Sequence, residues 1–342
     1  MTTIEIVNLL KSSEYGFLRT NPYLGENIIL LTLGGSHAYG TNIEGSDLDI
    51  RGCALNPKSD ILINQSFEQV TDKATDTTIY AFNKLISLLT NCNPNVIEML
   101  GNKKEHYFHI SPIGQELLDN ASLFLSKKAA YSFGGYASAQ LRRLDNKTVR
   151  SVGQADKEKH ILSSVKNAYQ IFSEKYFEPP EDAIRLYIDK SSREDIDVEI
   201  FMDVTLHRYP LRDYKNMLGE MNQIVKEYER IGHRNKTAAE HGKLSKHMMH
   251  LIRLYIMCLD ILECGQIITY REKEHDLLMD IRNGKYLSSD KQPLPEFFEM
   301  VKDYEKKMEY AKANSFLPKK PDYKRINEFV MSVNERVVKG EI

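Results

Sequence analysis

The chain has few cysteines and no large excess of charge of either sign. Its 342 residues include four cysteines, none of them in a C-x-x-C pair, so there is no disulfide framework and a reducing compartment is favoured. Lys and Arg total 46 against 48 Asp and Glu, a formal net charge of −2. That balance excludes a highly basic, histone-like binder, although it leaves room for a local basic groove.

Long apolar runs are missing as well. None reaches the roughly 18–20 residues that cross a bilayer, and the N-terminus lacks the basic and apolar regions of a signal peptide. With 42% hydrophobic and 27% charged residues, the composition is that of a globular protein, which excludes wholesale disorder. We therefore expect a soluble, cytoplasmic protein of about two domains that has no membrane partner.

Residues 1–115 carry a mixed strand and helix pattern. A continuous apolar run at 27–35 ends in paired glycines, which is typical of a buried strand that enters a tight turn. Apolar-rich segments at 48–55 and 77–82 predict two further strands. Helices are expected directly after the third strand, at 83–91 and 94–100.

Beyond residue 115 glycine becomes sparse and helical periodicity dominates. One broad apolar stripe runs from Leu244 to Leu262, and Gly265 is placed to end that helix. A hairpin is predicted within 183–203. Further helices are predicted at 4–11, 126–144, 157–174, 212–231, 296–313 and 322–338. The sequence thus predicts an α+β fold, in which an N-terminal domain (1–115) with a small mixed sheet and helices precedes a mainly α-helical domain (116–342).

Two short motifs carry most of the chemistry. The adjacent Gly34 and Gly35 allow a sharp turn that exposes backbone N–H groups to an anion, and Ser36 adds a hydroxyl there. Asp47 and Asp49 follow, two residues apart in the predicted second strand, so their carboxylates are expected on one face. Such a pair repels itself unless a divalent cation binds, and Mg²⁺ suits two carboxylates plus substrate phosphates.

Each motif alone is more often structural, as a loop or an exposed strand edge. Their order, spacing and position beside buried-strand patterns favour a phosphate cradle next to a metal site. This is the equipment for nucleotidyl transfer with two metal ions.

The combined pattern G-G-S-x-A-Y-G-x(6)-D-L-D-I-R resembles the signature of the DNA polymerase beta nucleotidyltransferase superfamily. Tyr39-Gly40 and the ending at 46–51 are similar to its RNA-repair-associated RlaP branch. Weaker similarities to the same branch continue at 80–84, 93–100, 133–141, 246–254 and 281–284. The resemblance therefore covers most of residues 27–285.

The resemblance implies roles for particular residues. Gly35 and Ser36 would hold the terminal phosphates of a nucleoside triphosphate, and Asp47 and Asp49 would bind Mg²⁺, with Mn²⁺ as the alternative ion. The superfamily usually has a third carboxylate on a neighbouring strand, which helps to position or deprotonate the acceptor hydroxyl. We assign Asp76 as this third catalytic and metal-binding residue, with Asp72 and Glu68 as alternatives because the strand boundary is uncertain.

Three other polar residues each have two possible roles. Arg51 is expected to share a face with neither Asp, and could bind a phosphate or hold an internal carboxylate. Lys84, at a helix start, could neutralise triphosphate charge or be solvated. Glu98 could bond the backbone or orient Arg51.

Candidate contacts also come from the C-terminal half. The resemblance suggests that His250 and Arg253 face the cleft and contact nucleotide or acceptor, the alternative being a buried histidine and a surface arginine. Two basic patches could track an RNA backbone or form ordinary solvated faces. The first patch consists of Lys127, Lys128, Arg142, Arg143, Lys147 and Arg150, and the second of Lys319, Lys320, Lys324 and Arg325.

The resulting hypothesis is a Mg²⁺-dependent nucleotidyltransferase that uses an NTP substrate and has a cleft between its two domains. It would move an NMP to an acceptor hydroxyl, expected at an RNA or tRNA end, and release pyrophosphate. One alternative keeps the reaction but makes a protein side chain the acceptor, as in a toxin or regulator. The other is a non-catalytic nucleotide- or RNA-binding module.

Overall fold

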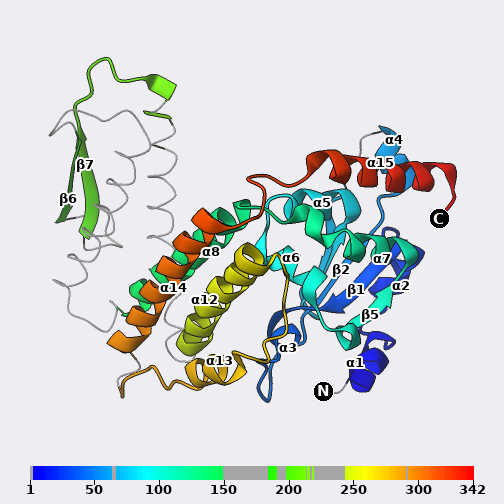
Figure 1. Cartoon of the computed structure of the whole chain (residues 1–342), viewed down its shortest axis with the longest axis horizontal. Coiled ribbons are helices and arrows are strands. Elements are labelled where there is room, and N and C mark those ends of the chain that lie inside the picture. Colours follow the sequence, from blue (N-terminus) through cyan, green and yellow to red (C-terminus); the bar gives the residue numbers. More distant parts are fainter. Residues whose placement is uncertain are drawn as a thin grey trace. The chain divides into compact units, whose positions relative to one another are not determined.

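The structure is a computed structural model that describes residues 3–63, 67–148, 184–190, 198–212, 214–215, 218, 243–289 and 292–342. These residues belong to two compact units (Figure 1). The first unit joins Met1–Leu141 to Ser245–Ile342, and the second is Arg142–Leu244.

A five-stranded mixed sheet forms the centre of the first unit. Its strand order is β3-β4-β2-β1-β5, in which β2 and β4 are parallel and the other neighbours are antiparallel. The strands are β1 (Ile28–Leu33), β2 (Ile50–Ala54), β3 (Gln69–Asp72), β4 (Thr77–Ala81) and β5 (Tyr107–Ile110). Every residue of β1 is buried, as its continuous apolar run predicts. The predicted α+β class with a small mixed sheet is confirmed.

Short helices precede, connect and follow the strands. They are α1 (Thr3–Leu10), α2 (Phe17–Thr20), α3 (Gly35–Tyr39), α4 (Lys58–Ile63), α5 (Phe82–Leu89), α6 (Pro94–Ile97) and α7 (Pro112–Asp119). On α5 the buried residues are Phe82, Leu85, Ile86 and Leu89, the i, i+3, i+4 and i+7 positions of one face. Helix α6 starts where the sequence indicates, because the Asn93 side chain accepts a hydrogen bond from the Asn95 N–H and Pro94 occupies the first turn.

The C-terminal helices pack with the sheet in the same unit. They are α12 (Lys243–Leu259), α13 (His275–Arg282), α14 (Pro295–Asn314) and α15 (Tyr323–Lys339), together with the first part of α8 (Lys128–Thr148). Helices α12 and α14 lie side by side, with a hydrogen bond of 3.1 Å from Tyr255 Oη to Glu305 Oε1 (Figure 1). A π-helical turn at Asp260–Cys264 extends α12, and Gly265, at φ +63°, ends it as predicted.

The second unit contains the predicted hairpin. Strands β6 (Ile184–Lys190) and β7 (Val198–Val204) pair antiparallel, with Ile184 opposite Val204 and Lys190 opposite Val198. The helix predicted at 157–174 and most of the one predicted at 212–231 lie outside the described residues.

This division differs from the boundary predicted between residues 115 and 116. The loop after α12 adds backbone hydrogen bonds to the N-terminal part, from Thr269 N to Gly101 O (3.1 Å) and from Arg271 N to Tyr39 O (3.2 Å). Helices α12 to α15 therefore belong to one unit with the sheet, although they are distant from it in sequence. The extent of the catalytic domain itself stays a prediction.

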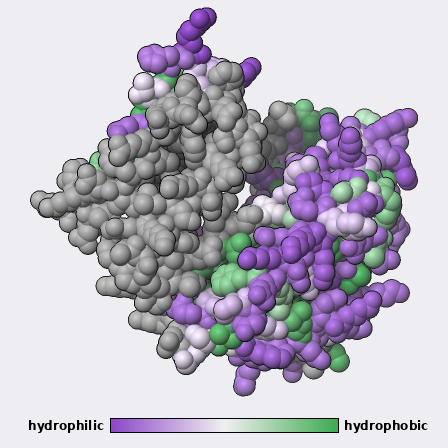
Figure 2. Space-filling view, turned by 60° about the vertical axis from the view of Figure 1, so that its left-hand side comes forward, coloured by the Kyte–Doolittle hydropathy of each residue, from purple (hydrophilic) through white to green (hydrophobic). Residues whose placement is uncertain are grey.

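The described helices include none with the length and apolar character needed to span a membrane. Figure 2 shows one face of the molecule, on which the described residues are mostly hydrophilic and the hydrophobic ones stand in small groups. Isolated apolar residues of this kind are normal on a protein surface.

A glycine replacement tests the packing of α7 on β1. A Cβ at Gly114 would overlap the backbone oxygen of Ile29 in β1, whereas a Cβ at Gly135 in α8 meets nothing within 4 Å. Gly114→Ala should therefore lower the free energy of unfolding by about 1–3 kcal/mol through overpacking. Gly135→Ala should be neutral or stabilising by up to about 1 kcal/mol, because alanine favours a helix. Urea unfolding measures both, and equal stability of the two variants would contradict the described α7–β1 contact.

Candidate active site

The turn between β1 and α3 brings the paired glycines against Asp49. Gly35 has φ +56°, a conformation that favours glycine, and a Cβ there would overlap Asp49 Oδ2. At Gly34 a Cβ would come within 2.7 Å of Arg51 Cγ, and the Gly34 N–H donates to Asp49 O at 2.9 Å. The glycines are thus needed for close approach of the segment that carries the acids. The glycine turn therefore contacts Asp49, one of the two aspartates of the predicted motif.

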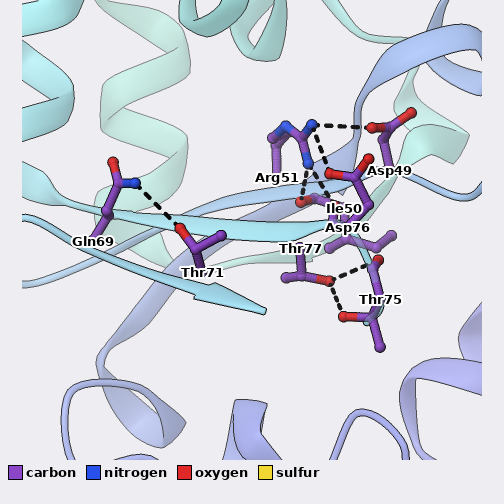
Figure 3. Close-up of polar contacts among 8 residues, drawn as sticks. All are labelled: Asp49, Ile50, Arg51, Gln69, Thr71, Thr75, Asp76 and Thr77. Carbon is purple, nitrogen blue, oxygen red and sulfur yellow. Dashed lines mark hydrogen bonds and ion pairs between the residues drawn. The ribbon is translucent and has the colours of Figure 1, made fainter. Parts of the chain in front are cut away.

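Two predicted carboxylates share one guanidinium (Figure 3). Arg51 Nη2 lies 3.0 Å from Asp49 Oδ1 and 3.4 Å from Asp76 Oδ1. Arg51 Nη1 also donates to the backbone oxygens of Asp76 (2.6 Å) and Ile50 (3.0 Å). Asp76 has φ +44°, which is uncommon outside glycine, and the Ile50 N–H also donates to its backbone oxygen at 3.3 Å. Backbone and side chain of Asp76 are both held beside Asp49.

The surroundings of Asp49 shift its pKa. Burial raises the pKa of Asp49 to about 6, against the opposing charge of Arg51. The neighbouring Asp76 carboxyl raises this pKa further by hydrogen bonding and repulsion, whereas Lys246 from α12 lowers it. Two oxygen-bearing groups that resist simultaneous ionisation suit a hard divalent cation, which would remove the repulsion. By donor chemistry Asp49 and Asp76 fit Mg²⁺.

The third predicted ligand, Asp47, is exposed in the loop that precedes β2. Within the described ranges no group of three or more His, Cys, Asp and Glu side chains is arranged to hold a metal ion. The structure thus brings together Asp49 and Asp76, and the place of Asp47 in the set stays a prediction.

Two details of the predicted strand are wrong. Strand β2 begins at Ile50, paired with Leu33, so both aspartates precede the strand instead of lying in it. Arg51 was expected on the same face as neither Asp, yet it bonds Asp49. Residues two apart in an extended chain point to the same side, which explains this contact. Of its two predicted roles, Arg51 fulfils that of holding internal carboxylates.

The alternatives for the third carboxylate are engaged elsewhere. Asp72 Oδ1 accepts a hydrogen bond from the Ala74 N–H (2.9 Å) in the turn between β3 and β4. Glu68 Oε2 pairs with Lys84 Nζ at 3.1 Å. The structure therefore favours Asp76 as the partner of Asp49. It also places Lys84 beside Glu68, so a phosphate contact by Lys84 stays a prediction.

A buried network links Glu98 to the glycine turn. The Glu98 side chain, on a 3₁₀ turn at Glu98–Gly101, is buried and accepts hydrogen bonds from Tyr39 Oη (2.5 Å) and from the Gly35 N–H. Burial raises the pKa of Glu98, and the charge of Arg253 and the bond from Tyr39 oppose this shift. Glu98 thus takes the first of its predicted roles, a bond to the backbone.

Helix α12 presents a basic face toward this network. Lys246, His250 and Arg253 lie at i, i+4 and i+7, and Lys246 acts electrostatically on Asp49. The Arg253 guanidinium carbon lies 3.5 Å from the Tyr39 ring centroid, and Nη2 lies 2.7 Å from His250 Nδ1. Arg253 is only 8% exposed, so the alternative of a surface arginine does not hold.

Arg282, at the end of α13, was missed as a functional candidate. Its Nη2 donates to Ser46 Oγ at 3.3 Å, directly before Asp47 in sequence. Burial, followed by the charge of Arg253, lowers the pKa of Arg282. The only sequence signal was its position in the weak similarity at 281–284.

The structure describes the side chains of Lys127 and Lys128 in the first basic patch and of all four residues in the second. Lys127 Nζ donates to Ala313 O (3.4 Å), and Lys128 Nζ donates to Tyr323 Oη (2.8 Å), so both lysines contact C-terminal helices. The side chains of Arg142, Arg143, Lys147 and Arg150 lie outside the described residues. Lys319, Lys320, Lys324 and Arg325 are exposed.

Comparison with known proteins agrees with this site. Residues 12–172 match RlaP, described as the RNA repair pathway DNA polymerase beta family. The predicted resemblance to the RlaP branch is thereby confirmed. The RlaP match includes the glycine turn, Asp47, Asp49 and Asp76, whereas Arg253 and Arg282 lie beyond it. No match to the chain was found among curated proteins or among solved structures.

Replacing Glu98 tests the buried network. Glu98→Ala leaves the Tyr39 hydroxyl and the Gly35 N–H without an acceptor, and Arg253 without this carboxylate. It should lower the free energy of unfolding by about 3–5 kcal/mol, and Glu98→Gln should cost less because an amide oxygen remains. The control Glu105→Ala, an exposed change, should stay within about 0.5 kcal/mol. Chemical unfolding measures these values. A Glu98→Ala variant as stable as the control would contradict the network.

The pH dependence of stability tests the environment of Asp49. Its folded-state pKa of about 6 exceeds the ordinary 3.8, so between these values the folded state binds the additional proton. The stability of the wild type relative to Asp49→Asn should therefore fall as pH rises from about 4 to about 6, and level off above that window. Unfolding in EDTA buffers measures this difference, with the exposed Asp303→Asn as control. A difference that stays constant across the window would contradict the raised pKa.

Proposed function

We propose that the chain is a Mg²⁺-dependent nucleotidyltransferase that transfers an NMP from an NTP to an acceptor hydroxyl on RNA or tRNA. The observation that carries this proposal is the packing of Asp49 against the Gly35 turn with Asp76 beside it. This arrangement falls inside the segment that matches RlaP, a family of polymerase beta type. We place the activity in the cytoplasm, where the four cysteines, all free thiols, would stay reduced.

Each candidate residue has a part in the proposed reaction. Asp47, Asp49 and Asp76 would hold the divalent cations, two ions of Mg²⁺ or Mn²⁺. When bound, such ions neutralise triphosphate charge and polarise the reacting phosphate. Gly35 and Ser36 would face the terminal phosphates from the start of α3, with Ser36 reaching them from a buried position (8% exposed).

The chemical step is an in-line displacement. The acceptor oxygen forms a bond to the α-phosphorus, the bond from that phosphorus to the bridging oxygen of the β-phosphate breaks, and pyrophosphate leaves. The hydroxyl proton passes to a carboxylate. Asp76 suits that role because its side chain is 57% exposed, whereas that of Asp49 is 19% exposed. Arg51 orients Asp76 through its guanidinium group.

The remaining basic side chains of the predicted site would bind substrate. Arg253 and His250 are joined to each other above Tyr39, in the same network as the Gly35 turn. They would contact a nucleotide bound at that turn. Lys84 would join them only by leaving Glu68, to which it is paired.

The activity test uses labelled NTPs, Mg²⁺, total RNA and total protein as acceptors. Wild type should label RNA, and Asp49→Asn or Asp76→Asn should reduce the rate by about 10²–10⁴-fold, because each removes a charge at the reacting centre. Asp47→Asn should act similarly, and the exposed Asp303→Asn should retain full activity.

Each other outcome overturns a stated part of the proposal. Label on protein but not on RNA would replace the acceptor with a protein side chain. No label on either, with NTP binding retained, would make the chain a binding module. Full activity of Asp49→Asn and Asp76→Asn would displace the reaction from this site.

A further inference from the structure

Two arginines near the site have N–H groups that find no acceptor among the described residues. Arg253 Nε, Arg282 Nε and Arg282 Nη1 are buried and meet no acceptor within the described part of the chain. The Arg253 side chain is more than nine-tenths buried. A buried charged donor without an acceptor is unfavourable, so the arrangement calls for an acceptor that the described residues do not supply.

Three other arginines are paired with carboxylates, although Arg271 Nε also lacks an acceptor in the described ranges and Arg19 donates to backbone oxygens. Arg51 bonds Asp49, Arg271 bonds Asp260, and Arg336 makes a two-pronged contact with Glu116. Arg282 instead bonds a neutral hydroxyl, that of Ser46, and Arg253 bonds a histidine nitrogen. Glu98 acts on Arg253 electrostatically, but its hydrogen bonds come from Tyr39 and Gly35.

The two guanidinium groups also repel each other. The positive charge of Arg253 contributes to the lowered pKa of Arg282, after burial. Two like charges that are close enough to interact, and that lack carboxylate partners at their unused donors, are stabilised by an anion between them.

Arg253 and Arg282 both contact residues next to the candidate active site. Arg282 contacts Ser46, the residue before Asp47, from α13. Arg253 stacks on Tyr39, the last residue of α3, whose first residue is Gly35 of the glycine turn. Lys246 lies two turns before Arg253 on α12 and acts on Asp49. The unused donors therefore adjoin the segment at 35–49 from two C-terminal helices.

We propose that Arg253 and Arg282 form an anion subsite that binds the β- and γ-phosphates of the incoming nucleotide. The assignment rests on the proposed function and adds Arg282, which neither the motif nor the RlaP match includes. A terminal polyphosphate fits better than an RNA backbone, because several charges in one place match two adjoining guanidinium groups. An RNA strand carries one charge per nucleotide and would need a longer basic track.

The test measures binding without turnover. The probes are inorganic tripolyphosphate, AMP and a single-stranded RNA oligomer, each titrated calorimetrically into the full chain with Mg²⁺. Arg282→Met should weaken tripolyphosphate binding by about 10-fold or more, and leave AMP and RNA affinities unchanged. Arg282→Lys should give an intermediate loss. Lys285→Met is the matched control, since Lys285 is three residues away, exposed and paired with Asp280, and it should bind tripolyphosphate as the wild type does.

Thermal unfolding separates a ligand-binding arginine from a structural one. Without ligand, Arg282→Met should be as stable as the wild type or more stable, because it removes an unsatisfied buried charge. The stabilisation that tripolyphosphate confers on the wild type should shrink in the variant. A structural arginine would give the opposite pattern, with a less stable variant and unchanged binding.

Three results would overturn the inference. They are a wild type that does not bind tripolyphosphate, equal tripolyphosphate affinity of wild type and Arg282→Met, and a loss confined to RNA binding. A wild type that binds tripolyphosphate through Arg282 but labels no acceptor would support the subsite and refute the proposed transferase activity. The two proposals can therefore fail separately.

Discussion

The close packing of the Asp49 carboxylate against a turn without side chains is the constraint on which the site depends. Gly35 must be a glycine for two reasons at once, its positive φ and the absence of space beside Asp49. The same contact sets the position of Arg51, which comes two residues later and bridges to Asp76. The Gly35 turn, the Asp49 carboxylate and the Arg51 guanidinium are thus in direct contact with one another. A change at any one of them moves the other two.

Buried residues outside the turn fix the position of α3. Glu98 binds the Gly35 N–H and the Tyr39 hydroxyl, so both ends of the short α3 are tied to one buried carboxylate. Arg253 then stacks on Tyr39 from α12, and Arg271 N bonds Tyr39 O from the loop that follows. Because α3 has only five residues, it cannot maintain its geometry alone. The C-terminal helices supply that rigidity, which explains why they form one unit with the sheet.

Much of this could be read from the sequence, and the failures have physical causes. Strand β1 and helix α12 were predictable because long apolar patterns report burial directly. Strands β3 and β5 were missed because each has only four residues at a sheet edge, where the side chains are exposed or half-buried. Asp76 contacts Arg51, and its assignment as the third carboxylate stays a prediction. Arg282 carried only the weak similarity at 281–284, since its proximity to Ser46 joins residues 236 positions apart.

The distribution of charge connects the two halves of the site. The N-terminal segment contributes the acids, Asp49 and Asp76, and neutralises them in part through its own Arg51. The C-terminal helices contribute cations, Lys246, Arg253 and Arg282, for which this segment supplies few partners. A ligand that carries both divalent cations and phosphate charge satisfies the two sets together, because the cations meet the acids while the phosphates meet the arginines. Such complementarity is what the proposed metal-bound nucleoside triphosphate would require of its site.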